Sequence, residues 1–502
     1  MPDRIPSALR LANYALFTGA SLYLAVFLVV ALSRLTYPFD LEWMEGGAVA
    51  HVQRILDDQP LYVKPSIDFT PFIYTPLYFQ VGALAARVVG NGFFPLRLVS
   101  LLASLGAFAF IFLIVRRRTA DRAASFLAVG LFAATFRISG AWFDLARVDS
   151  LFLVLLLAGI YAFDSPSASV RSFIAPVLIV LSFYAKQSAL VVGLGLAAAA
   201  FLTLRGRERW LFPVGFGLLL AGSVAVADWV TEGWFGFYVF ELPARHEVLD
   251  AMLVRFWTDD ILGPLAIAST ACLVPFIGLS GWNRSRFVRD VLILGSLLVV
   301  SYLSRIHEGG YDNVLMPAFA GIAIYAGIGA GCLIGATKGS HRIRLVATLA
   351  AALQFLILAY SPGDQVPTVE DRDRGRQLQA LILGLGGEVY IAGHPWYTGD
   401  LGEPVHAHEV ALRDILRATG TSTWRDALER EMAAAIAARR FDAVVTDFLD
   451  FPLRPPDFDS HYELLAQDLS RGDLRMVTGW DRRPSYLFVK RESGPPSPDD
   501  DP

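Results

Sequence analysis

The sequence predicts a mainly α-helical protein that crosses a membrane many times and ends in a small α/β domain. Of its 502 residues, 54% are hydrophobic and 18% are charged, and the mean hydropathy is +0.47. This composition is too apolar for a soluble protein of this size. The apolar residues also fall into long runs, close to the roughly 20 residues that a membrane-spanning helix needs. The density of charge rises only after Asp364, where the long apolar runs end.

The apolar runs predict about eleven membrane-spanning helices. Seven are long: 11–33, 98–115, 188–204, 210–227, 261–283, 313–337 and 345–361; four are shorter: 123–139, 150–163, 172–185 and 291–304. The first run is longer than the core of a signal peptide, so we interpret it as a retained span. The run 72–86 could be a further span or a helix lying in the membrane interface.

Basic residues favour the second interpretation of 72–86. If the N-terminus is cytoplasmic and 72–86 does not cross, the arginine- or lysine-rich loops 116–122, 205–209, 284–290 and 338–344 all face the cytoplasm. A crossing at 72–86 would move every one of these loops to the other side, against the positive-inside rule. We therefore predict a multi-pass protein of the cytoplasmic (inner) membrane with an interfacial or re-entrant helix at 72–86.

This topology divides the chain into three parts. We expect a membrane domain over 1–362, a small extracytoplasmic α/β domain over 363–490, and a disordered tail over 491–502. Periodicity in the second part predicts helices at 370–383 and 423–439 and strands at 388–392, 441–446 and 486–490.

The polar residues that are costly in a membrane protein fall on the predicted external side. They come from five separate loops or span ends, as expected if they converge on one site. They are Asp40, Glu42, Glu45, Lys64, Asp144, Arg147, Asp149, Lys186, Gln187, His246, His307, Glu308, Asp312 and Asn313.

Two of these residues have a structural and a functional interpretation. Arg147 could pair with an acid and stabilise its loop, or its guanidinium could grip phosphate oxygens with two parallel hydrogen bonds. Lys186 could extend toward the membrane interface, or it could neutralise a lipid phosphate.

The histidines also leave alternatives open. His307 and Glu308 could form part of a plain turn, contact a sugar or phosphate, or contribute to a metal site, although the helical HExxH spacing is missing. In the α/β domain, His394, His406 and His408 could bind a metal, but we expect them to be surface residues near loops.

Three short motifs resemble the GT-C fold glycosyltransferases. They are the acidic Asp40-Leu41-Glu42 after the first span, the aromatic Tyr74-Thr75-Pro76-Leu77-Tyr78, and Arg147-Val148-Asp149 before a later span. The sequence looks most like the branch that holds protein O-mannosyltransferases and the transferase adding aminoarabinose to lipid A. The resemblance covers roughly residues 10–360. Lys64 departs from the family's pattern, because it precedes the aromatic motif.

The resemblance implies transfer of a sugar, with inversion, from a polyprenyl-phosphate donor to a glycan, lipid or protein acceptor outside the cytoplasmic membrane. It implies that Asp40, Glu42 and Asp149 are catalytic, and our hypothesis makes Asp40 the base. Arg147 and Lys186 would hold the phosphate. The remaining substrate-binding candidates are Glu45, Lys64, Tyr74, Tyr78, Asp144, Gln187, His307, Glu308, Asp312 and Asn313. No cofactor is required, although several of the acids could hold a divalent cation.

Two other classes of function compete with this hypothesis. A transporter, flippase or polymerase of lipid-linked saccharides should place ionisable residues near the middle of the bilayer, whereas these lie at span ends. A non-catalytic membrane protein would instead use its external domain to bind a partner. The net charge of −4 gives no basic surface for a nucleic acid.

Overall fold

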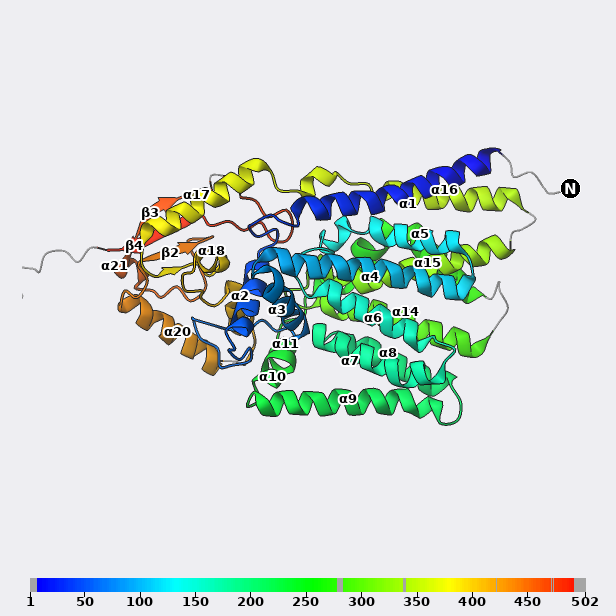
Figure 1. Ribbon diagram of the computed structural model, residues 1–502, viewed down its shortest axis with the longest axis horizontal. Coiled ribbons are helices and arrows are strands. Elements are labelled where there is room, and N and C mark those ends of the chain that lie inside the picture. The colour runs from blue at the N-terminus through cyan, green and yellow to red at the C-terminus, as the bar shows by residue number, and fades with distance from the viewer. Residues whose placement is uncertain are drawn as a thin grey trace, which may run out of the picture.

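Long helices form a bundle, and a small α/β domain lies against one end of it (Figure 1). The structure, a computed structural model, describes residues 7–277, 283–336, 340–420, 422–470, 472 and 474–491. The N-terminus lies at the end of the bundle that is far from the α/β domain (Figure 1).

Each predicted span coincides with a helix. The helices are α1 (Ser7–Arg34), α4 (Phe93–Thr119), α5 (Arg122–Ala134), α6 (Asp149–Phe163), α7 (Ala175–Ala185), α8 (Ala189–Thr203), α9 (Glu208–Val230), α13 (Gly263–Leu273), α14 (Arg284–Ile306), α15 (Met316–Ala336) and α16 (His341–Ile357). In the described residues, six helical stretches are long and apolar enough to cross a membrane, and one bent pair beginning with α16 makes a seventh. Helices α5 to α8 are shorter but apolar. The prediction of a polytopic helical membrane protein is confirmed.

Small residues let the helices of the bundle approach one another. A Cβ atom added to Gly327 of α15 would come within 2.7 Å of Ala128 of α5, and one added to Gly106 of α4 would come within 2.8 Å of Val154 of α6. Membrane helices commonly pack through such residues, because apolar burial from water contributes little to their association.

Helices α2 (Glu45–Leu56) and α3 (Leu77–Val89) lie between the bundle and the α/β domain (Figure 1). With 13 residues, α3 is about 20 Å long and does not reach across a hydrocarbon core of about 30 Å. This supports the interfacial position predicted for 72–86. Helix α4 then runs away from the α/β domain, so that Arg116, Arg117 and Arg118 lie at the far end of the bundle (Figure 1).

Two short helices, α10 (Trp234–Gly236) and α11 (Leu242–Ala244), follow α9 and lie at the end of the bundle that faces the α/β domain (Figure 1). Helix α12 (Asp250–Arg255) begins the continuous helical stretch Asp250–Ile277, which includes α13.

The α/β domain is built on a four-stranded mixed sheet with the order β1-β2-β4-β3. The strands are β1 (Val389–Tyr390), β2 (Ala443–Thr446), β3 (Tyr462–Gln467) and β4 (Tyr486–Lys490); β1 and β2 are parallel and the other pairs antiparallel. Its helices are α17 (Val369–Leu385), α18 (Trp396–Gly399), α19 (Glu409–Leu416), α20 (Ser422–Ala437) and α21 (Phe458–His461). A capping box of Thr368 and Asp371 fixes the start of α17.

The predicted strands and helices of this domain are present, and β3 is an addition. The sequence of β3 does not alternate between apolar and polar residues. The strand lies at an edge of the sheet and exposes Leu464 and Leu465. The predicted disordered tail lies outside the described residues, except for Arg491.

Candidate active site

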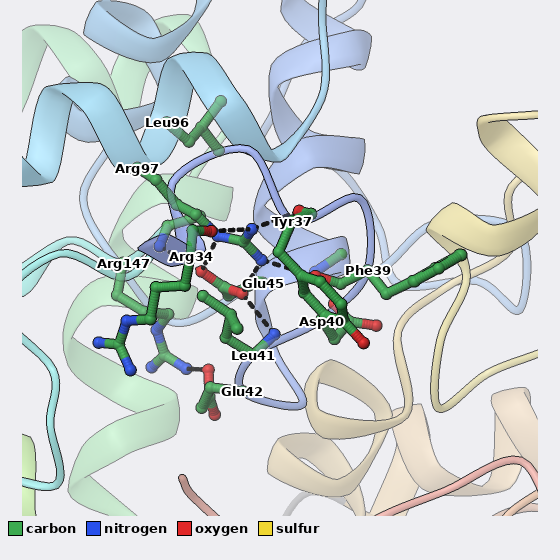
Figure 2. Close-up of polar contacts among 12 residues, drawn as sticks. Arg34, Tyr37, Phe39, Asp40, Leu41, Glu42, Glu45, Leu96, Arg97 and Arg147 are labelled. Atoms are coloured by element: carbon green, nitrogen blue, oxygen red, sulfur yellow. Dashed lines mark hydrogen bonds and ion pairs between the residues drawn. The ribbon is translucent and has the colours of Figure 1, made fainter. Parts of the chain in front are cut away.

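The loop between α1 and α2 is held in place by a buried ion pair, Arg97–Glu45 (Figure 2). Arg97 of α4 donates from Nε and Nη2 to the two oxygens of Glu45, at 3.0 and 2.6 Å. The same carboxylate accepts the backbone N–H groups of Leu41 and Ala146, at 2.8 and 2.6 Å. Arg97 also donates to the carbonyls of Arg34, Tyr37 and Phe39. Every polar atom of the pair therefore has a partner, as expected of a structural element.

A second satisfied pair joins α1 to the loop before α6. Arg34 donates from Nε to Asp144 at 2.7 Å and from Nη2 to the other carboxylate oxygen. Its remaining donors reach the carbonyls of Ala141 and Gln365, at 2.7 and 3.1 Å. Both side chains are buried. The predicted binding residues Glu45 and Asp144 thus hold the backbone of the two loops that carry Glu42 and Arg147.

Beside these pairs, six predicted residues come together, and we call them the polar cluster: Glu42, Tyr74, Arg147, Asp149, Lys186 and Asn313. Arg147 donates from Nη1 to Glu42 Oε2 at 2.7 Å and from Nη2 to the Tyr74 hydroxyl at 2.9 Å. Lys186 Nζ and Asn313 Nδ2 both donate to Asp149 Oδ1, at 2.6 and 3.0 Å. The Tyr74 ring joins the two halves, since the charged groups of Arg147 and Lys186 lie 5.6 and 5.9 Å from its centre.

Each acid of the polar cluster keeps one oxygen without a partner. Glu42 Oε1 and Asp149 Oδ2 are buried and accept no hydrogen bond from the described residues. The same is true of Gln187 Oε1, although Gln187 donates to the carbonyl of Ile73 beside Tyr74. Unpartnered buried oxygens are costly in a folded protein and point to a site where a ligand group binds.

Burial also changes the basicity of Glu42. Removal from water raises the pKa of its carboxyl, and the neighbouring Arg147 opposes this only in part, so the pKa rises to about 7. A carboxylate with this pKa is suited to accept a proton near neutral pH. Burial lowers the pKa of the Arg147 guanidinium, but Glu42 and Tyr74 outweigh burial and raise it. Arg147 therefore stays charged.

Asp40 faces a different partner. Its Oδ1 accepts the backbone N–H of Gly46 at 2.7 Å, and its Oδ2 lies 2.9 Å from Nδ1 of His394 in the α/β domain. The side chain is buried. In Figure 2, Asp40 lies toward the α/β domain, whereas Glu42 pairs with Arg147 on the other side of Glu45. The two acids of the Asp40-Leu41-Glu42 motif thus belong to separate networks.

Several other predicted residues lie outside the polar cluster. Lys64 is exposed, and its amine stands 5.7 Å from the centre of the Trp424 ring. Tyr78 is fully buried and its hydroxyl bonds to the Leu96 carbonyl at 3.0 Å.

Most predicted residues of the loop after α14 bond to neighbours outside the polar cluster. His307 Nδ1 bonds to the carbonyl of Leu303 at 2.7 Å, and the backbone N–H of Glu308 donates to the backbone carbonyl of Glu247 at 2.9 Å. Asp312 pairs with Arg305 at 3.1 Å. Of this loop, only Asn313 reaches the polar cluster. The predicted His246 bonds to the carbonyl of Asp414 in the α/β domain.

Two important residues, Arg34 and Arg97, were not singled out from the sequence, and His394 was named only as a possible metal ligand. The two arginines carried a usable signal, because an arginine at the edge of an apolar run needs a partner. His394 carried none, and the expectation that it, His406 and His408 lie on the surface is wrong, since all three are buried.

The polar cluster does not have the donors of a metal site, because Glu42 and Asp149 are each paired with a cation of the chain. Within the described ranges, Asp68, Glu388 and His406 are the group whose ligand atoms lie within 4.8 Å of one another. Arg440 already binds both of these acids, at 2.8 and 2.7 Å. The residues present thus fit a divalent cation poorly, and no catalytic step below uses one.

Comparison with known proteins gives the fold a family context. Residues 73–230 match the family model described as dolichyl-phosphate-mannose-protein mannosyltransferase. The structure is similar to ArnT from Cupriavidus metallidurans bound to undecaprenyl phosphate, with a TM-score of 0.58 and 13% identity, over 95% of this chain and 99% of that one. The chain has the GT-C glycosyltransferase fold. The family model and the fold agree on one enzyme class, a membrane glycosyltransferase, as the sequence motifs predicted.

Other comparisons of this GT-C protein are more distant. ArnT in the apo state aligns with a TM-score of 0.50 and 15% identity, over 94% of this chain and 97% of that one. An oligosaccharyltransferase from Archaeoglobus fulgidus aligns with a TM-score of 0.49 and 12% identity, over 85% of this chain and 69% of that one. Comparison with the curated proteins finds no significant match. The segment matched by the family model carries Tyr74, Arg147, Asp149 and Lys186 of the polar cluster.

Proposed function

We propose that this glycosyltransferase moves a sugar from a polyprenyl-phosphate donor to an acceptor hydroxyl at the polar cluster. The observation that carries the proposal is the pairing of Glu42 with Arg147 and of Asp149 with Lys186, with one carboxylate oxygen of each acid unpartnered. Two cations and a free base are the groups that a phosphate leaving group and a hydroxyl nucleophile need. The undecaprenyl phosphate bound by ArnT, a protein of the same fold, supports this class of donor.

The proposed reaction is a single displacement. The acceptor oxygen attacks the anomeric carbon while its proton passes to Glu42 Oε1. The bond from the anomeric carbon to the phosphate oxygen breaks, and the polyprenyl phosphate leaves with the electron pair. Arg147 and Lys186 neutralise the charge that develops on it. Attack opposite the leaving group inverts the anomeric centre.

The three predicted catalytic acids receive different roles in this proposal. Glu42 is the base, because it has a free oxygen and a pKa of about 7. Asp149 orients Lys186. The assignment of Asp40 as the base stays a prediction; both of its oxygens already accept hydrogen bonds, which favours a role in holding the loop.

The proposal extends to the membrane and the parts of the chain. Helix α4 begins beside α3 and runs away from the α/β domain, and its last turn carries Arg116, Arg117 and Arg118 (Figure 1). The positive-inside rule then supports an extracytoplasmic site on a cytoplasmic membrane. We propose 1–362 as the catalytic membrane domain and 363–490 as the extracytoplasmic domain, with a glycan, lipid or protein as acceptor.

Release of polyprenyl phosphate from a panel of polyprenyl-phosphate sugars tests the proposal. The purified protein would be assayed in lipid nanodiscs, with and without a delipidated envelope extract as a source of acceptors. We expect release from one donor, and Glu42→Gln should lower it about 10²- to 10⁴-fold. Asp40→Asn should retain more activity than Glu42→Gln. The opposite ranking would make Asp40 the base, and no release from any donor with the extract present would contradict the proposed function.

A further inference from the structure

The α/β domain covers the loop that carries Glu42. The backbone N–H of Val477 donates to the Leu41 carbonyl at 3.1 Å, and the Tyr311 hydroxyl donates to the Gly479 carbonyl at 3.4 Å. Gly479 has a φ of +83°, and a Cβ there would lie 3.0 Å from Cγ of Glu42. This part of the domain is therefore in direct contact with the candidate base.

At the same interface, His394 connects two carboxylates that belong to different parts of the chain. It follows β1 and is fully buried. Its Nδ1 lies 2.9 Å from Asp40 Oδ2 in the first loop, and its Nε2 lies 3.5 Å from Asp447 Oδ1, just after β2. One imidazole thus bridges the membrane domain and the sheet of the α/β domain.

A fourth charge extends this chain of groups. Asp447 Oδ2 lies 3.7 Å from Nη1 of Arg482, which is itself fully buried. The Arg482 guanidinium stands 4.8 Å from the ring of Trp43 and 4.4 Å from the ring of Trp480. Charges of alternating sign therefore run from Asp40 to Arg482, which also pairs with Glu409 at 2.6 Å and lies beside the ring of Trp43, the residue next to Glu42.

The surroundings favour the charged form of His394. Burial by itself lowers its pKa, but Asp447 and Asp40 outweigh burial and raise the pKa to about 10. His394 is accordingly a charged donor to Asp40 at neutral pH rather than a neutral imidazole, and it opposes the burial that raises the pKa of the Asp40 carboxyl.

We propose that His394 is a positioning residue for sugar transfer and acts through Asp40 on Glu42. Asp40 and Gly46 flank Glu42, and the bond between them closes the loop around it. His394 fixes the other oxygen of Asp40, so the orientation of the loop depends on the docked α/β domain. The proposal rests on the proposed function and makes the α/β domain part of the active site.

A double-mutant cycle of His394→Gln and Asp40→Asn tests this role. We expect His394→Gln to lower kcat by about 10²-fold, since small displacements of a catalytic group have effects of this size, and to leave KM for the donor unchanged. The double variant should be about as slow as Asp40→Asn alone, because the two residues act as one unit. If the two substitutions acted independently, their fold-losses of kcat would instead multiply in the double variant.

His406→Gln is the matched control. His406 is also buried in the α/β domain and also faces two carboxylates, Asp68 at 3.4 Å and Glu388 at 3.5 Å, but it does not contact Asp40. It should retain the parental kcat. If His394→Gln fails to fold, Asp447→Asn serves in its place, because it keeps the His394–Asp40 contact while removing the second carboxylate; it should lower kcat less.

The outcomes separate this proposal from the proposed function. A parental kcat in His394→Gln, or multiplicative losses in the cycle, would overturn the positioning role while leaving the transferase intact. If His406→Gln lowered kcat as much as His394→Gln does, both losses would reflect general damage to the α/β domain. That result would also overturn the positioning role of His394. If the parental protein releases no polyprenyl phosphate, the proposed function fails first.

Discussion

Two arginine–glutamate pairs, Arg97–Glu45 and Arg147–Glu42, hold the same first loop and differ in one respect. In Arg97–Glu45, both carboxylate oxygens accept two hydrogen bonds, and the guanidinium holds three carbonyls as well. In Arg147–Glu42, one carboxylate oxygen has no partner among the described residues. Burial and charge are alike in the two pairs. Hydrogen-bond saturation, rather than depth or charge, therefore separates the structural ion pair from the candidate catalytic one.

The same contrast recurs in the neighbouring pairs. Arg34–Asp144 resembles the saturated pair, since both carboxylate oxygens accept from the guanidinium. Lys186–Asp149 resembles the open pair, because Asp149 Oδ2 remains unpartnered within the described part of the chain. The saturated pairs tie backbone segments together, and each open pair has its cation within 6 Å of the centre of the Tyr74 ring. Substitutions in the two kinds of pair should therefore affect different properties.

The largest effect is expected for Arg97→Met. The substitution leaves the Glu45 carboxylate buried without its cation, and it removes the donors to the three carbonyls of the first loop. Breaking a buried pair in this way costs about 3–5 kcal/mol of folding stability. The yield of monodisperse protein and its thermal unfolding in detergent measure the loss. A variant that melts like the parent would contradict the structural role of this pair.

A smaller effect on folding but a large one on activity is expected for Arg147→Lys. Lysine keeps a positive charge beside Glu42 but cannot donate to Glu42 and Tyr74 with the same planar geometry. We expect kcat to fall about 10²-fold, as for the loss of one preorganised donor. The unfolding midpoint should stay close to that of the parent. If Arg147→Lys lost both folding stability and activity, Arg147 would have a structural role like that of Arg97 and Arg34.

The smallest effect concerns pH. The carboxyl of Glu42 has a pKa raised to about 7, so its basic form declines as pH falls below 7. Turnover should then fall about tenfold for each pH unit below 7 and level off above it. The same shift means that ionising Glu42 disfavours the folded state, so the contribution of Glu42 to stability should be lost as pH rises from about 4.5 through 7.

Rates of donor cleavage between pH 5 and 8.5 measure this dependence. Thermal unfolding over the same range, for the parent and for Glu42→Gln, measures the effect on stability. A pH-independent rate in the parent would contradict the assignment of Glu42 as the base. Glu42→Gln should remove the part of the pH dependence of stability that Glu42 contributes in this window.

The sequence predicted the membrane architecture well, because length and hydropathy are local properties. Each of the eleven predicted spans corresponds to a helix, and the short α3 fits the interfacial position that basic residues favoured for 72–86. Motifs that flank the spans also identified all six members of the polar cluster. The edge strand β3 was not predicted, because an exposed edge leaves little alternation in its sequence.

Residue type alone could not separate the members of the first loop. Asp40, Glu42 and Glu45 look equivalent in the sequence, but they face His394, Arg147 and Arg97, which lie far away along the chain. Lys64 and His307 were equally plausible binding residues, and the fold directs them to Trp424 and to the carbonyl of Leu303. The partner, and therefore the role, depends on contacts across the whole chain.

Residue order alone was enough to recognise a polytopic helical membrane protein whose candidate site residues lie at span ends on one side. Apolar runs must be buried in lipid, and charged groups must then lie at their ends. Only the tertiary structure decided which acid keeps a free oxygen and which is saturated. It also decided that His394 of the α/β domain reaches Asp40, because hydrogen-bond saturation is a property of neighbours in space and not of neighbours in sequence.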